Sequence, residues 1–506
     1  MKIASIMNFA RQVDQRMEDS EKILFNATRA ELEMVNEFGL DNTFLLQYDV
    51  LCDPRYAELF REKGTEKTEL GIWYEIVEPM TSACGIPYDS KKGWKWDWHI
   101  IPGFSMAYTP SERELLIDEA MRKFKEVFGY YPKTVASWLF DTHTLNHLVK
   151  HYDVSAVAIC RDQANTDAYT LLGGYFNQAY YPSANNIFTP AQSKEMQTNV
   201  PVFRLLGPCP IHNYDNHKYS SDTFRASCKR APCTLEPVWY MGSNEEAVKW
   251  MFDCYYEEES LGFAYAQIGQ EISFFTKKEQ IFNGLRMQIE LLLGQKKEVV
   301  FQKMCDTGEA FKSRYPDLTP ATSLVAPNSF DGADAQSIYY NCKNYTANLF
   351  RFEDKVFFRS LFLFDERVKE HYLEEICQTF DAVYENMPIV DTMTCPFEER
   401  KQGGLMIHTG TTSLAASKAA EDVLNVQFGE KAVTFYEDRI EVVTDQLIWY
   451  KNATGASVAL DESGLSFIYK GHAYRLDVVG ATAKESDGNI EFRATGDRIV
   501  LYPQKA

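Results

Sequence analysis

The chain has no run of about 18 apolar residues, the length that a membrane-spanning helix needs. It is also poor in basic residues: 52 Lys and Arg stand against 72 Asp and Glu, which gives a net charge of −20 at pH 7. Nucleic-acid-binding proteins need a basic surface, and anionic membranes repel an acidic chain. We therefore expect neither a nucleic acid nor a membrane as partner.

Several chemical signatures are also missing. The eleven cysteines are odd in number and form no Cys-x-x-Cys pair, which favours free thiols in a reducing compartment. No glycine-rich phosphate loop is present, and no Gly-x-Ser-x-Gly elbow marks a nucleophilic serine. The apolar stretch at the N-terminus is too short for a secretion signal. The sequence thus predicts a cytoplasmic protein and identifies no certain cofactor.

What the chain does have is a repeated pattern of short apolar runs that each stop on an acidic residue. The five acidic ends are Asp49, Glu75, Asp141, Asp162 and Glu271. Helix-like stretches separate most of the runs, and we count seven or eight strand–helix units within residues 1–316. This pattern predicts an α/β fold with a distorted TIM-like barrel, whose strand C-termini open onto one face that holds the active site. Each acid could instead cap a helix, since Asp is a common N-cap.

The pattern changes after a Pro- and Thr-rich boundary near Tyr315–Ser323. Residues 317–400 are expected to form a mixed connecting region of short strands, with a helix near Val368–Asn386. Residues 401–506 contain many short alternating strands with turn signals, which predict an antiparallel β-sandwich. Because the acidic ends lie almost wholly in the first part, we expect the chemistry there.

Strand alternation assigns the candidate side chains to faces. Gln47 shares a face with Asp49, Trp73 with Glu75, and Gln267 with Glu271, so these side chains are expected to point into the barrel mouth. Residues on the opposite faces suit packing against helices; they include Phe44, Leu46, Ile72 and Tyr74. Asp162, Gln163 and Arg204 complete the polar set, and Arg204, in the middle of a strand, needs an acidic partner.

The segment Gly93–His99 holds three tryptophans in five residues, Trp94, Trp96 and Trp98, alternating with Lys95 and Asp97. One side of it could form an aromatic wall on which a sugar ring stacks. Packing of the indoles on the barrel rim is the alternative.

Two Asp-x-His pairs stand out, Asp97-Trp-His99 and Asp141-Thr-His143. In extended backbone the two members of each pair face the same way, so a pair could bind a metal or form a histidine oriented by a carboxylate. A histidine satisfied by its own loop is the alternative.

The residues assembled above resemble the glycoside hydrolase/deacetylase superfamily, and within it a bacterial group without a characterised activity. The matching stretches lie within the first 320 residues: Thr43–Asp49, Gly71–Glu75, Trp96–His99, Phe128–His143, Arg161–Tyr181 and Val202–Gly207. The resemblance implies a distorted barrel of about seven strands. By strand position, it also implies a carboxylate nucleophile at Asp141 and an acid at Glu271.

The chain departs from the metal-dependent deacetylases of that superfamily. Their early T-F-D-D strand end reads Gln47-Tyr48-Asp49 here, and their pair of metal-binding histidines on the next strand is missing. A divalent metal such as zinc would have to be held by Asp49 together with His99 or His143.

The sequence thus predicts a hydrolase that cleaves glycosidic bonds in an oligosaccharide or glycoconjugate. Asp141 is expected to be nucleophile or base and Glu271 general acid, with the other strand-end carboxylates, Asp49, Glu75 and Asp162, nearby. Residues expected to bind substrate are Trp73, Trp96, Trp98, Asp97, Gln163, Arg204 and Gln267. Two alternatives stay open: a metal-dependent carbohydrate deacetylase and a non-catalytic sugar-binding protein. The sequence does not indicate an oligomeric state.

Overall fold

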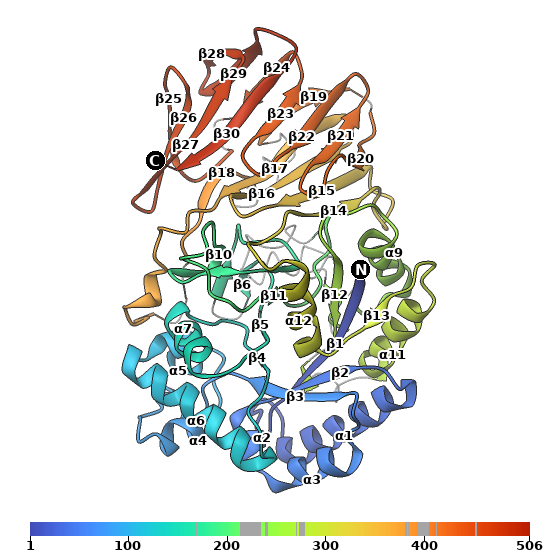
Figure 1. The fold of residues 1–506 in the computed structure, drawn as a ribbon, viewed down its shortest axis with the longest axis vertical. Coiled ribbons are helices and arrows are strands. Elements are labelled where there is room, and N and C mark those ends of the chain that lie inside the picture. The colour runs from blue at the N-terminus through green and yellow to red at the C-terminus, as the bar shows by residue number, and fades with distance from the viewer. Residues whose placement is uncertain are drawn as a thin grey trace.

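The chain folds into an α/β part that ends with helix α12 and a β-rich part stacked against it (Figure 1). The computed structural model describes residues 1–166, 169–212, 234–237, 241–269, 271–272, 279–379, 382, 384–392, 404–410, 412–450 and 453–505.

A curled sheet of nine strands, mostly parallel, organises the α/β part. In spatial order the strands are β12 (Ala264–Ile268), β1 (Lys2–Ala10), β2 (Asn42–Leu46), β3 (Thr68–Trp73), β4 (Thr134–Ala136), β5 (Ala156–Ile159), β11 (Val202–Arg204) and β8 (Ala179–Tyr180), with β13 (Val300–Phe301) beside β1. All neighbours from β12 to β11 pair in parallel, and β8 pairs antiparallel to β11. The prediction of consecutive strand–helix units is thereby confirmed.

The barrel is not closed by a backbone ladder within the described residues. Side chains bridge the gap between the two ends of the sheet instead. The Leu206 N–H donates to Gln267 Oε1 (2.6 Å), and Asn177 Nδ2 donates to the carbonyl of Tyr265 (3.0 Å). The predicted TIM-like barrel is thus observed as an open, curled half-barrel whose edges are joined by amides.

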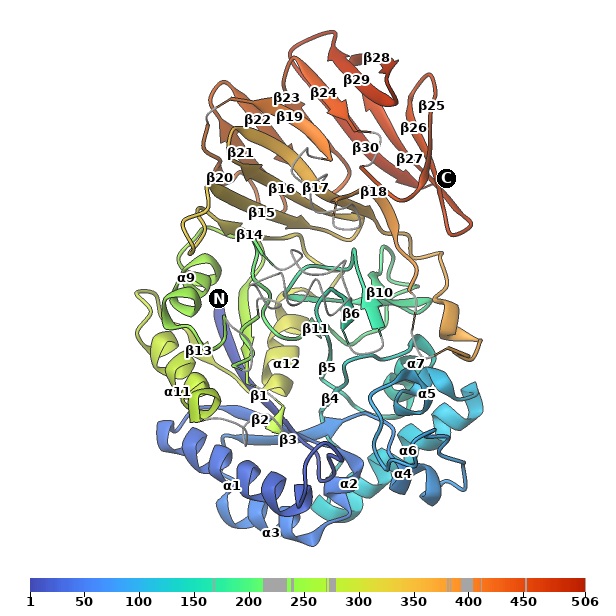
Figure 2. The same ribbon diagram turned by 180° about the vertical axis from the view of Figure 1, so that it is seen from behind.

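Helices cover the outer face of this sheet (Figure 2). They are α1 (Ser20–Phe38), α2 (Tyr48–Leu51), α3 (Pro54–Lys63), α4 (Glu78–Ala83), α5 (Ile100–Gly103), α6 (Pro110–Phe128), α7 (Thr142–His151), α9 (Glu245–Tyr256) and α11 (Glu279–Leu293), with the 3-10 turn η1 (Ser105–Ala107). Thr109 begins α6 with a capping box completed by Glu112. No helix among the described residues is long and apolar enough to cross a membrane.

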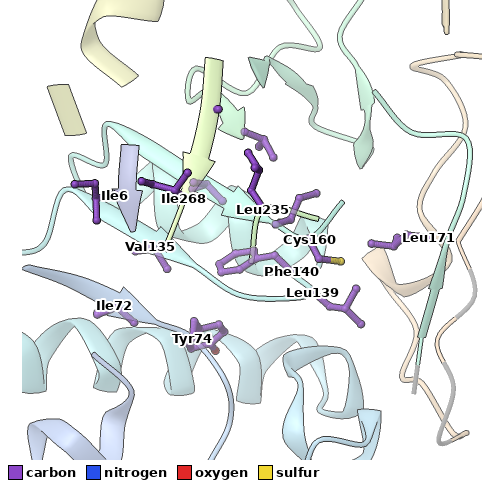
Figure 3. Packing of buried hydrophobic residues seen from close by; sticks show 14 of the residues in the cluster. Ile6, Ile72, Tyr74, Val135, Leu139, Phe140, Cys160, Leu171, Leu235 and Ile268 are labelled. Carbon is purple, nitrogen blue, oxygen red and sulfur yellow. The ribbon is translucent and has the colours of Figure 1, made fainter. Parts of the chain in front are cut away.

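The two faces of the sheet carry different cores, as strand alternation predicts. Ile6, Ile72, Val135 and Ile268 belong to the outer core beneath the helices (Figure 3). The concave face carries a second cluster that includes Met7, Leu45, Trp73, Phe203 and Tyr265, and α12 (Met304–Arg314) fills it with Met304 and Phe311.

Helix α12 lies very close to β5. A Cβ atom on Gly308 would fall 2.1 Å from the Ser155 carbonyl oxygen, so only glycine fits there. The N-terminus of α12 meets Glu69, which accepts from the Cys305 N–H (3.1 Å), and Thr43, which accepts from the Met304 N–H (3.0 Å). α12 therefore fills the half-barrel at the end opposite to the strand C-termini.

Two antiparallel sheets form the β-rich part and enclose one apolar core. The first contains β14 (Thr322–Ala326), β15 (Ala335–Asn341), β16 (Tyr345–Phe352), β17 (Lys355–Leu363), β18 (Met387–Asp391), β19 (Leu405–Thr409), β24 (Gln446–Trp449), β29 (Asn489–Ala494) and β28 (Ala481–Ser486). The second contains β20 (Ala415–Lys418), β21 (Leu424–Phe428), β22 (Lys431–Phe435), β23 (Ile440–Val443), β30 (Ile499–Lys505), β27 (His472–Val479), β26 (Gly464–Tyr469) and β25 (Ser457–Leu460). Because β17 pairs with β19, strands from residues 317–400 and from residues 401–506 share one sheet.

The prediction of a helix near Val368–Asn386 is wrong. Apart from the short turn η2 (His371–Leu373), the described residues of this segment are not helical. Its backbone pairs with the α/β part instead: the carbonyls of Tyr372 and Glu375 accept from Arg113, and the Cys377 N–H donates to Met106. Tertiary hydrogen bonds have replaced those that a helix would have made within itself.

The excursions after β5 and β11 join the two parts. They include the short strands β6 (Gln163–Thr166), β7 (Tyr169–Leu171), β9 (Pro182–Ser183) and β10 (Asn186–Pro190). Phe176 stacks on Tyr339 of β15 at a centroid distance of 3.6 Å, and Arg359 of β17 donates to the carbonyls of Pro210 and Ile211. The eight cysteines among the described residues are free thiols.

Candidate active site

Three aromatic side chains lie at the C-terminal end of the half-barrel interior. Phe9 of β1 stacks on Trp73 of β3 at a centroid distance of 3.7 Å, and Trp138, just after β4, packs edge-on against both, at 5.3 and 5.1 Å. Together they form an aromatic floor. The residues that follow these strands stand above it.

Two of the strand-end carboxylates meet on one arginine. Arg11 follows β1 directly; its Nη2 lies 3.4 Å from Glu75 Oε2, and its Nη1 lies 3.2 Å from Glu271 Oε1. The side chains are 1%, 2% and 7% exposed for Arg11, Glu75 and Glu271. The planar fork of a guanidinium fixes both partners at once, so the two carboxylates are held as a pair.

Glu75 is the more enclosed member of the pair. Its Oε2 also accepts from Gln47 Nε2 (2.9 Å) and from the indole N–H of Trp96 (2.8 Å). Burial raises the pKa of Glu75, and the nearby Glu271 charge raises it further, while Arg11 and the Trp96 hydrogen bond oppose the rise. The net direction is upward, which favours a protonated acid.

Glu271 is contacted by a second guanidinium. Arg16 Nη2 lies 3.4 Å from Glu271 Oε1, and the same arginine is held by Asp14, with Nε 2.7 Å from Oδ1 and Nη2 2.5 Å from Oδ2. Although burial acts to raise the pKa of Asp14, the hydrogen bonds and charge of Arg16 hold it below its usual value. Acids and arginines therefore alternate through the cluster, in the order Glu75, Arg11, Glu271, Arg16 and Asp14.

The tryptophan-rich loop forms one wall of this cluster. The Arg11 guanidinium lies 3.6 Å from the Trp96 ring centroid, and that of Arg16 lies 5.0 Å from Trp96 and 5.6 Å from Trp98. Trp96 is buried, whereas Trp94 and Trp98 are half-buried. Trp96 thus packs within the cluster, and Trp98 stands at its rim.

Asp49 lies next to the cluster but binds backbone. Its carboxylate accepts from the N–H groups of Gln12 and Val13, each at 3.0 Å, and of Val50 at 2.8 Å. Burial raises its pKa to about 6, although these hydrogen bonds act in the opposite direction. Asp49 therefore fastens the loop that carries Arg11 and Arg16.

Asp141 has the environment of a helix cap. It is the N-cap of α7, and its oxygens accept from the N–H (2.9 Å) and the hydroxyl (2.6 Å) of Thr144 and from the hydroxyl of Ser105. Arg113 Nη1 lies 3.1 Å away, and both side chains are fully buried. These contacts are those of a helix cap with a buried counter-ion, and none of them joins Asp141 to Glu75 or Glu271.

Asp162 is also bound by structural donors. Arg204 Nη2 lies 2.6 Å from its Oδ1, which supplies the acidic partner that Arg204 requires, and the Gly173 N–H donates to its Oδ2 (2.9 Å). Gln267 accepts from Leu206 across the sheet gap, and Trp73 lies in the aromatic floor. The side chain of Gln163 lies outside the described residues.

The residues proposed for a metal are not brought together. His99 Nδ1 pairs with Asp97 Oδ1 (2.6 Å), His143 Nε2 pairs with Glu114 Oε1 (3.0 Å), and Asp49 binds backbone N–H groups. Within the described ranges, no three His, Cys, Asp or Glu side chains are grouped so that they could hold a metal ion. Asp49, His99 and His143 therefore do not fit a zinc site.

Sequence reasoning missed Arg11, Asp14 and Arg16. All three lie in the loop after the first strand, which is followed by a cation and so does not show the pattern of an apolar run that stops on an acid. The signal was available, because Arg11 stands where a parallel strand delivers its side chain to the mouth.

Comparison with known proteins identifies the fold. No protein-family model matches the sequence, and no curated protein matches it. A crystal structure named a putative glycoside hydrolase/deacetylase from Parabacteroides distasonis matches with a TM-score of 0.50 and 14% identity, over 75% of this chain and 87% of that one. A putative polysaccharide deacetylase from Mycobacterium smegmatis matches with a TM-score of 0.34 and 13% identity, over 62% and 91% of the two chains, a likeness too low to add to the first. At 14% identity this likeness shows a shared fold alone, and that fold agrees with the one that the resemblance in the sequence implies.

Proposed function

We propose that this chain is a carbohydrate-active hydrolase whose reacting carboxylates are Glu75 and Glu271. The observation that carries the proposal is the convergence of both side chains on Arg11 at the C-terminal mouth of the half-barrel. Glycosidic bonds are typically cleaved by a pair of carboxyl groups, one acid and one nucleophile or base. The P. distasonis protein of the same fold carries a glycoside hydrolase/deacetylase name, which supports this substrate class.

The environments of the two carboxyls suggest different roles. Glu75, whose pKa is raised by burial, is suited to give its proton to the leaving glycosidic oxygen as the bond to the anomeric carbon breaks. Glu271, which both the Arg11 and the Arg16 guanidinium contact, is suited to the role of the second carboxyl. It would either attack the anomeric carbon or take a proton from the attacking water.

The spacing of Glu75 and Glu271 is compatible both with attack by Glu271 on the anomeric carbon and with activation of a water molecule by Glu271. Two contacts across one guanidinium limit the distance between the contacting oxygens to about 9 Å, within the range seen in glycosidases. The substrate is an oligosaccharide or glycoconjugate, with the half-buried Trp98 at the rim as a stacking residue.

This proposal revises the roles expected from the sequence. The acid moves from Glu271 to Glu75, and the nucleophile or base moves from Asp141 to Glu271, because Asp141 is bound by α7 and Arg113. Metal-dependent deacetylation has no supporting ligand set among the described residues.

The test is turnover of aryl glycosides and oligosaccharides by the purified chain and by Glu75→Gln and Glu271→Gln. Each amide is expected to lower kcat by about 100-fold or more, since it removes one acid–base partner. Glu69→Gln is the matched control. Glu69 is a buried carboxyl on the same face of β3 as Glu75, but at the opposite end of the strand, which α12 fills. It should leave kcat unchanged.

Three results would refute the proposal. Equal losses in the Glu69 variant would make the effect one of folding. Sugar binding with no turnover on any substrate, unaffected by either amide, would favour the non-catalytic alternative. Release of acetate from acetylated sugars that depends on Asp49, His99 or His143 would favour the deacetylase.

A further inference from the structure

The rim of the candidate site carries two cations on one tryptophan. Lys92 Nζ lies 4.2 Å from the Trp94 ring centroid and 5.9 Å from that of Trp98, and Arg16 Cζ lies 5.6 Å from the same Trp98 ring. Trp94 and Trp98 contact each other at 4.8 Å. The stack runs from the exposed Lys92 to Arg16, which touches Glu271.

Aromatic contacts hold a cation in place without cancelling its charge, whereas a carboxylate partner would cancel it. Lys92 makes no ion pair with an acidic side chain in the described part of the chain. The nearby Asp97 is 5% exposed and turned inward, where it binds the Ser90 hydroxyl and His99. Lys92 is therefore held in place at the rim by aromatic rings and not by a carboxylate among the described residues.

This cationic rim contrasts with the rest of the molecule. The chain has a net charge of −20, yet Lys91, Lys92 and Lys95 are all exposed in one short loop, against one exposed acid, Asp89. A local positive patch beside a binding mouth attracts anionic ligands. The surrounding negative charge would otherwise repel them.

We propose that the substrate is an acidic oligosaccharide, in which a sugar unit with a carboxylate or sulfate group binds Lys92 while its ring lies against Trp98. This inference rests on the proposed function, because Arg16 links the rim to Glu271. The anionic unit occupies the position next to the cleaved bond. Lys92 determines specificity and takes no part in the chemistry.

The test is calorimetric binding to the Glu75→Gln variant, which is expected not to consume the ligand because it lacks the proposed acid. The probes are galacturonotriose, its carboxyl-reduced counterpart galactotriose, and a sulfated galactotriose. At least one acidic probe should bind about tenfold or more tightly than the neutral one, since a charge-assisted contact is gained. The relative affinities of the carboxylate and sulfate probes identify the anionic group.

Variants of Lys92 separate charge from packing. Lys92→Met should lower the affinity for the acidic probe to that for the neutral one and leave neutral binding unchanged, whereas Lys92→Arg should retain it. Lys249→Met, on an exposed lysine of α9, is the control and should change neither. Equal binding of acidic and neutral probes, or a loss for both in Lys92→Met, would overturn the inference.

The two proposals fail separately. Turnover of neutral oligosaccharides that depends on Glu75 and Glu271, without preference for an anionic group, would refute the acidic substrate alone. Lys92-dependent binding of acidic sugars by a chain that cleaves none of them would support the rim assignment and refute the hydrolase.

Discussion

Glu75 and Glu271 share a single guanidinium, with Arg11 Nη2 3.4 Å from the one and Arg11 Nη1 3.2 Å from the other. The two acids come from β3 and from the end of β12, with β1 and β2 between these strands in the sheet. Two buried carboxyls at this spacing repel each other when both are charged. Arg11 reduces that repulsion, so the ionisation of the two carboxyls as a pair depends on Arg11.

Replacing Arg11 with methionine should therefore affect both stability and pH dependence. Removing one partner of a buried charge cluster typically costs about 3–5 kcal/mol of unfolding free energy. Because Arg11 opposes the rise in the pKa of Glu75, its loss should raise that pKa further. If Glu75 is the acid, the basic limb of the pH–rate profile should move to higher pH. Arg11→Lys keeps the charge and should move it less. An unchanged limb in Arg11→Met would contradict the role of Glu75.

Another buried carboxyl, outside this cluster, should contribute to the pH dependence of stability. Glu31 of α1 is 0% exposed, neither of its oxygens has a hydrogen-bond partner among the described residues, and burial raises its pKa well above the usual value. The unfolded chain ionises Glu31 above its ordinary pKa, while the folded chain keeps it protonated. Stability should fall with rising pH by about 1.4 kcal/mol per pH unit until the folded pKa is reached.

Glu31→Gln removes this dependence while keeping the size of the side chain. Its advantage in unfolding free energy over the parent chain should therefore grow between pH 5 and pH 7, as measured by urea denaturation at each pH. Glu33→Gln, on the same helix but exposed, is the control. A constant difference across this range would show that Glu31 is ionised in the folded protein.

The close approach of α12 to β5 makes Gly308 a sensitive position. Gly308→Ala places a methyl group against the Ser155 carbonyl, and neither backbone can yield easily. Overpacking of this kind is expected to lower the unfolding free energy by about 2 kcal/mol or more. Gly294→Ala, where the nearest atom is 3.5 Å away, should be neutral. Thermal unfolding of both variants checks this, and equal melting temperatures would mean that α12 does not lie so close to the sheet.

Much of the fold follows from local patterns in the sequence. Alternation within strands correctly assigns Trp73 to the concave face and Phe44 and Ile72 to the helix-covered face. The helix start at Thr109 follows from Pro110 and Glu112. Among the described residues of 368–386 the lack of a helix could not be predicted, because their backbone is bound by Arg113 and Met106, which are remote in the sequence.

The candidate site was predicted only in part, for a physical reason. An acid at the end of a parallel strand lies where the next helix begins, so the same position suits a helix cap and an active-site carboxylate. What distinguishes them is the source of the donors. Asp141 receives two of them from its own helix, besides those from Ser105 and Arg113. Glu75 receives all of its described donors from other segments, namely Arg11, Gln47 and Trp96. Local sequence does not encode those long-range partners.

Asp141→Asn is the variant that distinguishes a helix-capping role of Asp141 from a catalytic one. An asparagine keeps the cap acceptor for the Thr144 N–H but leaves Arg113 buried without its counter-charge, which should cost about 3 kcal/mol or more of unfolding free energy. The folded fraction should keep its kcat on any substrate that Glu271→Gln fails to turn over, because Asp141 does not belong to the Arg11 cluster. The measurement pairs denaturation with kinetics normalised to folded protein. A loss of kcat as large as that in Glu271→Gln, with stability intact, would return Asp141 to the catalytic pair and remove Glu75 from it.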